Sequence, residues 1–103
     1  MKHPEEVEKY TGNLNELATD IGNLRYDKLA DFLDALRAKL ANDSEDDQNG
    51  KRYKLSAQLQ EAAVSIESAL TAIENAWEIS RPFEANRENY PDDKVQSRAN
   101  SSD

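Results

Sequence analysis

The chain contains no cysteine and a single histidine, and both shortages restrict the chemistry that it can perform. Without cysteine there are no disulfides, thiolate metal sites or thiol nucleophiles, and this composition is compatible with a reducing cytoplasm. His3 stands alone, and no Glu-x-x-His pair is present to build a di-metal site in a helical bundle. The three glycines are too far apart for a phosphate-binding loop. We therefore expect no catalytic residue, no metal site and no cofactor, and we expect that the protein is not an enzyme.

Long apolar runs are also absent. No run approaches the roughly 20 residues that a membrane span needs. The opening MKHPEEVEKY lacks the apolar core of a secretory signal. The net charge of −8 over 103 residues would repel nucleic-acid phosphates, so direct nucleic-acid binding is not expected. The sequence predicts a cytoplasmic protein with no membrane partner, built as one domain over residues 1–85.

What the chain does contain is three stripes of apolar residues that recur in alternating steps of three and four. Such spacing places each set on one side of a helix, which must then find a partner surface. The stripes comprise Val7, Tyr10, Leu14, Leu17, Ile21 and Leu24, then Leu29, Phe32, Leu33, Leu36 and Leu40, and finally Leu59, Ala63, Ile66, Leu70, Ile73 and Trp77. They predict an all-α fold, a small helical bundle of three helices in which the third is long.

The first predicted helix begins at Pro4, because proline suits the first helical turn. It ends at Gly22, since glycine followed by asparagine is typical of helix ends. The register supports a break there, because continuing the first stripe would require apolar residues where Lys28 and Asp31 stand. A turn or sharp kink near residues 22–26 explains the shift. The alternative is a continuous but re-registered helix, which would give a helical hairpin with a kinked first arm.

Turn-forming residues set the other predicted boundaries. The second helix is expected over residues 25–41, followed by a solvated loop at 42–50, where four acids accompany an Asn-Gly pair. The third helix is expected over 52–80 and stops before Pro82, because a residue that precedes proline is pushed out of the helical region. Residues 86–103 contain few large apolar side chains, so we expect a disordered acidic and polar tail.

The predicted lengths favour a homodimer. The first two helices are much shorter than the third, so neither alone could cover its stripe. Ala62, Ala69 and Ala76 recur every seven residues beside that stripe. They indicate either a close approach of a neighbouring helix or simple helix propensity, and in both cases a buried face. A second copy of the chain is the economical way to complete the bundle.

Two groups of residues are candidates for partner binding. The end of the third helix gathers Trp77, Ile79, Arg81 and Phe83, and such aromatic and arginine side chains are enriched at interface hot spots. Three acids, Glu67, Glu74 and Glu78, line its polar side. We therefore predict a small acidic interaction module that acts as an adaptor, regulator or inhibitor of another protein. The alternative is an inhibitor that mimics nucleic acid and occupies a nucleic-acid-binding protein.

Overall fold

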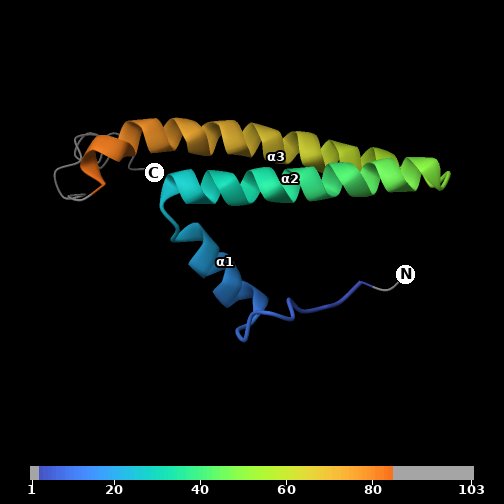
Figure 1. Cartoon of the computed structure of the whole chain (residues 1–103), viewed down its shortest axis with the longest axis horizontal. Helices are drawn as coiled ribbons and strands as arrows, with labels where there is room; N and C mark the ends of the chain where they lie inside the picture. Colours follow the sequence, from blue (N-terminus) through green and yellow to red (C-terminus); the bar gives the residue numbers. More distant parts are fainter. Residues whose placement is uncertain (1–2, 85–103) are drawn as a thin grey trace, which may run out of the picture.

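The computed structural model describes residues 3–84, which form three α-helices and a short 3-10 turn without any strand (Figure 1). The helices are α1 at Leu14–Gly22, α2 at Tyr26–Asn49 and α3 at Tyr53–Ser80, and the turn η1 follows at Arg81–Phe83. The predicted all-α class is confirmed. None of the helices in this range is long and apolar enough to cross a membrane. The predicted tail at 86–103 lies outside the described residues.

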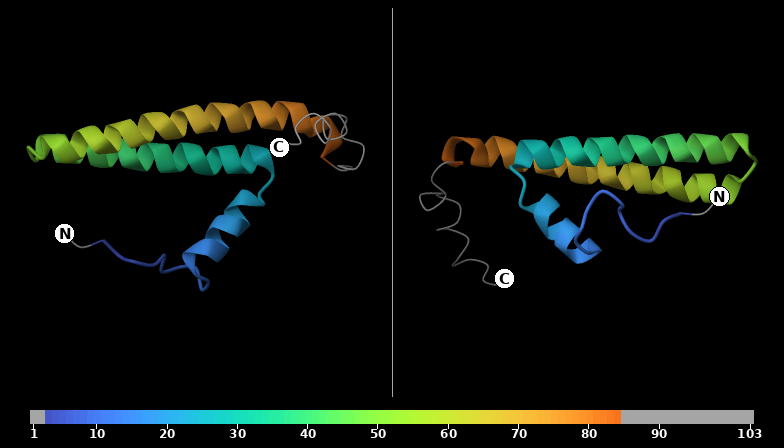
Figure 2. Two further views of the ribbon diagram at one scale, coloured as in Figure 1. Left: turned by 180° about the vertical axis from the view of Figure 1, so that it is seen from behind. Right: turned by 60° about the horizontal axis from the view of Figure 1, so that its bottom comes forward.

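α2 and α3 form an antiparallel hairpin and lie side by side along nearly their whole length (Figures 1 and 2). The seam between them follows a seven-residue repeat on both helices, as in a coiled coil. Its members, all buried or half-buried, are Tyr26, Ala30, Leu33, Arg37, Leu40, Ser44 and Asp47 on α2 and Ser56, Leu59, Ala63, Ile66, Leu70, Ile73, Trp77 and Ser80 on α3. The third predicted stripe is therefore the α3 side of this seam.

A pair of buried serines joins the two helices near the turn. The Ser44 hydroxyl donates to the Ser56 carbonyl oxygen at 2.8 Å. The Ser56 hydroxyl donates in return to the Ser44 carbonyl oxygen, also at 2.8 Å, and the two hydroxyl oxygens lie 3.0 Å apart. Because any other pairing of the helices would leave these buried groups without partners, the serines fix the register of the hairpin.

The prediction of a loop over residues 42–50 was wrong, because α2 continues to Asn49. Two of the four acids in this stretch, Asp43 and Asp47, have partners along the helix or across the turn. The Lys39 ammonium donates to both carboxylate oxygens of Asp43 at 2.7 Å. The Arg52 guanidinium donates to Asp47 at 2.7 Å, and Ser44 lies in the seam. The connection is thus confined to residues 50–52, where Lys51 adopts a left-handed conformation with φ of 66°.

The extra length of α2 also overturns the argument from unequal helices. α2 has 24 residues and α3 has 28, so α2 covers the seam of α3 almost from end to end. The alanine edge is not buried as a whole either, since Ala69 is exposed and Ala62 and Ala76 are half-buried. α2 packs on the stripe itself and leaves that edge open. The predicted break near residues 22–26 is confirmed, because α1 ends at Gly22 and α2 begins at Tyr26.

The first helix begins ten residues later than predicted. The Asn13 side chain accepts the Glu16 backbone N–H at 2.8 Å, and the Glu16 carboxylate accepts the Asn13 N–H at 2.8 Å. This capping box fixes the helix start at Leu14. Residues 3–13 are not helical, and the Tyr10 hydroxyl donates to the Asp20 carboxylate at 2.5 Å, which raises the pKa of Tyr10. Of the first stripe, Val7 and Tyr10 therefore precede the helix and Leu24 follows it.

The fold buries little apolar surface for its length. Among residues 3–84, Ala30 and Ala63 are the only buried apolar residues, and no large side chain is fully buried. α1 leaves the hairpin at a steep angle and its far end stands away from α2 and α3 (Figures 1 and 2). Such a hairpin has a thin core, and two-helix units of this kind depend on further packing for stability.

Candidate interaction surfaces

Trp77 lies in the seam at the open end of the hairpin. The Arg25 guanidinium carbon stands 5.4 Å from the centre of the indole ring, a cation–π contact. Arg25 is itself oriented by Asp27, whose carboxylate accepts two hydrogen bonds from it at 2.6 and 2.8 Å. These contacts tie the start of α2 to the end of α3. Trp77 thus closes the hairpin, and it is half-buried there.

The Arg25–Asp27 pair is held in its charged form. The hydrogen bond and the positive charge of Arg25 lower the pKa of Asp27 against a smaller opposing effect of desolvation. The same hydrogen bond and the negative charge of Asp27 raise the pKa of Arg25, with a further contribution from the charge of Glu84. Arg25 was missed by sequence reasoning because its aromatic partner lies far away in the chain, so no local spacing connects them.

The other predicted contact residues at this end of α3 do not form one surface with Trp77. Ile79 is two residues further along the helix, so it projects to roughly the opposite side, and it is exposed. Arg81 is exposed and donates to Glu78 at 3.2 Å. Phe83 is half-buried within η1. The four residues therefore divide between the seam (Trp77), an exposed side of α3 (Ile79) and the 3-10 turn (Arg81 and Phe83).

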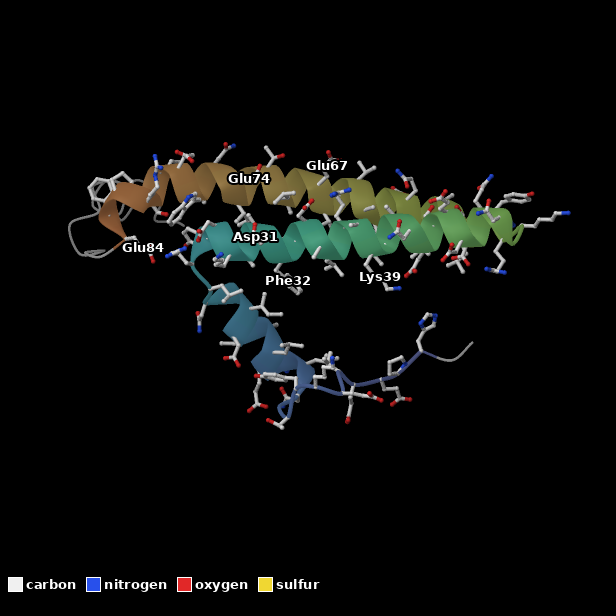
Figure 3. All side chains as sticks on the ribbon, viewed as in Figure 1. Asp31, Phe32, Lys39, Glu67, Glu74 and Glu84 are labelled. Carbon is white, nitrogen blue, oxygen red and sulfur yellow. The ribbon has the colours of Figure 1, made fainter. Side chains whose placement is uncertain are left out.

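One edge of the hairpin is acidic. A shallow groove lined by Ala41 and Gln48 of α2 and by Tyr53 and Gln60 of α3 identifies the positions that share this edge. Repeating those positions by sevens places Glu67 and Glu74 on the same edge, and both are exposed (Figure 3). Basic side chains offset part of this acidity.

Arg37 is one of the basic side chains that offset the acidity of this edge. Its guanidinium donates to Asp34 at 2.7 and 3.2 Å. The hydrogen bond with Asp34, and the negative charges of Asp34 and Glu67, raise the pKa of Arg37 against desolvation. Glu78 is likewise paired with Arg81. The acidic edge therefore presents Glu67 and Glu74 among carboxylates that are partly compensated.

The opposite edge has no acidic stripe, and we call it the neutral flank. Its α3 side carries no charged residue from Leu55 to Ile79, and each member is exposed or half-buried. These α3 members are Leu55, Gln58, Ala62, Ser65, Ala69, Ala72, Ala76 and Ile79. On α2 the flank continues with Leu29, Phe32 and Leu36, and then with the charged residues Lys39, Asp43 and Asp46, which follow at the same positions of the seven-residue repeat. Phe32 projects from α2 on the side from which α1 departs (Figure 3). Sequence reasoning found the alanines but placed them in a buried contact.

α1 adds a second uncovered apolar surface. Leu14 is 59% exposed and Leu24 is 40% exposed, while Leu17 and Ile21 between them are half-buried. Val7 belongs to the preceding segment and helps to line a hollow of about 370 Å³ together with Leu14 and Leu17. Two acids, Glu5 and Glu6, line the same hollow. α1 and the segment before it therefore present leucines beside negative charge.

The described residues contain no group of three or more acidic, histidine or cysteine side chains arranged to hold a metal ion. Comparison of the chain with protein-family profiles, with curated proteins and with solved structures found no match.

Proposed function

We propose that this protein is a small acidic helical interaction module, acting in the cytoplasm as an adaptor, regulator or inhibitor of another protein. It works as a homodimer and binds its target by surface contact, without turnover. The observation that carries this proposal is the uncovered apolar face of α1. Leu14 is exposed, Leu17 and Ile21 are half-buried, and the exposed Leu24 follows just after the helix. In a chain of which 33% of residues are charged, such an apolar stripe is typical of a segment completed by a partner.

The chemistry around α1 specifies the kind of target. Residues 3–24 include Glu5, Glu6, Glu8, Glu16 and Asp20 but only one basic residue, Lys9. The hollow beside Leu14 and Leu17 is of a size to accept a large apolar side chain. We therefore propose that the target presents an amphipathic segment whose apolar residues are flanked by lysine or arginine. Opposite charges would speed the encounter, and the leucines would supply most of the affinity.

The test is affinity capture from cells that produce the protein, with three versions of the full chain as bait. Leu17→Glu combined with Ile21→Glu places two charges on the apolar face of α1. Thr19→Glu combined with Asn23→Glu adds the same charge at the same spacing to exposed positions away from the hollow, and serves as the matched control. A target should be retained by the wild type and the control, and lost at least about 10-fold with the first variant.

Equal capture by all three baits, or no protein retained above background, would refute the role of α1. The nucleic-acid-mimic alternative makes a different prediction. In that case the retained protein would be displaced by nucleic acid, and Glu67→Gln with Glu74→Gln would weaken capture while the α1 variants would not.

A further inference from the structure

The neutral flank is too long for any uncovered helix of the same chain. From Leu55 to Ile79 it extends about 36 Å at about 1.5 Å per residue. α1 has nine residues and spans about 14 Å on the same scale. Even if α1 folded back along α2, more than half of the flank would remain exposed. Within residues 3–84 no segment is left that could cover it from end to end, so an occupant of the full flank must match the hairpin in length.

Charge limits which surface two copies of this chain could share. Each copy carries a net charge of −8, so two copies repel one another in most orientations. The acidic edge would bring Glu67 and Glu74 against the same residues of the other copy. The neutral flank has no charged residue on α3, so two α3 helices can meet there without burying a charge. On α2 the same edge carries Lys39 and Asp43, which neutralise one another as an ion pair. Self-association is thus favoured at this surface.

We infer that a second copy of the chain covers the neutral flank, with the two α3 helices antiparallel about a two-fold axis near residue 67. This inference deepens the homodimer of the proposed function and rests on it. Leu55 and Ile79 are each twelve residues from that axis, so Leu55 packs against the partner's Ile79, and Ile79 against the partner's Leu55. This is the self-complementary pattern that a two-fold interface requires.

The size of the side chains fits the same arrangement. Ala62, Ser65, Ala69 and Ala72 lie between the two bulky ends of the flank. Small residues at the centre let the two helix backbones approach closely, and the larger residues at either end fill the space where crossing helices diverge. Phe32 and Leu36 of α2 border this surface and extend the apolar contact.

The area is close to what a stable interface needs. A face of two adjacent helices, about 20 Å wide and about 36 Å long, covers about 700 Å². Stable interfaces bury about 800 Å² on each partner. Four large apolar side chains are available for burial, since Phe32 and Leu36 are each 37% exposed, Leu55 49% and Ile79 51%.

A disulfide experiment tests the orientation directly, because the chain has no cysteine of its own. Leu55→Cys combined with Ile79→Cys places two thiols about 36 Å apart in one chain, too far for an internal bond. In the inferred dimer each thiol faces its counterpart on the other copy. Mild oxidation should therefore give a covalent dimer.

Gln60→Cys combined with Glu74→Cys is the matched control. These residues are also equidistant from residue 67 but lie on the acidic edge. At least about 10-fold more covalent dimer is expected from the flank pair than from this control. Equal yields, a higher yield from the control, or no cross-linking from either pair would overturn the inferred interface.

Light scattering after size exclusion tests the dimer without cross-links. The wild type should run at twice the chain mass of 11.6 kDa. Ala69→Glu places like charges across the axis and should raise the dissociation constant at least about 100-fold. Thr71→Glu on the outer face should leave it unchanged.

Mixing Ala69→Glu with Ala69→Lys should restore association, which shows that the loss is electrostatic and not a folding defect. A wild type that remains monomeric at about 100 µM would refute the inference. In that case, capture that still depends on Leu17 and Ile21 would leave the interaction function of α1 standing.

Discussion

Replacing Ser44 with alanine should destabilise the hairpin measurably, although the change removes only one oxygen atom from a polar stretch of the chain. Two reciprocal hydrogen bonds of 2.8 Å join Ser44 and Ser56, so each single substitution removes one bond between the helices and leaves the other. Losing such a bond costs about 1 kcal/mol net. No sizeable cavity is created, so we expect no additional packing penalty.

Helix propensity offsets part of this loss of stability, because alanine is a better helix former than serine by a few tenths of a kcal/mol. Ser68→Ala, at an exposed position of α3 outside the seam and the neutral flank, measures that gain alone. Relative to it, Ser44→Ala should be destabilising by about 1–1.5 kcal/mol. Since the two hydroxyl oxygens are 3.0 Å apart, the Ser44→Ala/Ser56→Ala double variant should depart from additivity by about 0.5 kcal/mol or more.

The assay is urea unfolding followed by far-ultraviolet circular dichroism at one fixed protein concentration, because association changes the apparent stability. The midpoint should fall without a change in slope, since the surface exposed on unfolding is nearly the same. If Ser44→Ala were no more destabilising than Ser68→Ala, the seam would not extend to the turn. Residues 42–50 would then be solvated, as their composition alone predicts.

Three further outcomes follow from the turn and the open end of the hairpin. Lys51→Gly should stabilise the protein by about 0.5–1 kcal/mol in thermal unfolding, because glycine adopts the left-handed conformation without steric cost; a lower midpoint would contradict this account of the turn. Trp77→Ala should cost about 2 kcal/mol, since the indole is half-buried, and a loss below about 0.5 kcal/mol would show that it does not hold the open end closed. The Asp27 carboxyl should titrate in NMR below the ordinary pKa of about 3.9, and Arg25→Gln should return it towards that value. Because the folded pKa is lowered, the stability due to this pair is present above the ordinary pKa and is lost as the pH falls through the folded one.

Local signals predict much of the fold. The alternating steps from Leu59 to Trp77 predict α3 and its seam, and Pro82 marks its end. The shift in register near Gly22 predicts the break between α1 and α2. A capping signal at Asn13 and Glu16 was also present in the sequence, and it could have placed the start of the first helix correctly. Pro4 was preferred because proline also suits a helix start, and this preference extended the predicted helix too far.

The rest depends on contacts between distant residues. Ser44 and Asp47 continue the seven-residue repeat of α2, but a search for apolar periodicity cannot recognise polar seam positions. That these two polar residues fit the seam becomes clear only when Ser56 and Arg52 are placed opposite them. The Arg25 contact with Trp77 could not be predicted for the same reason, since 52 residues separate the two in the sequence. Sequence reasoning could therefore propose the end of α3 as a contact region, but it could not separate Trp77, which closes the hairpin, from Ile79, which is exposed.

The second predicted stripe explains why α2 carries more apolar surface than α3 covers. It combined two different faces of α2, because Leu33 and Leu40 lie in the seam while Phe32 and Leu36 lie on the neutral flank. A helix with two apolar faces needs two neighbours. Within one chain α2 has α3 on one face, and α1 stands away from the other (Figure 2). A returning α1 would reach Phe32 and Leu36 but not Leu55, so the face can be covered along its length only by a helix as long as α3.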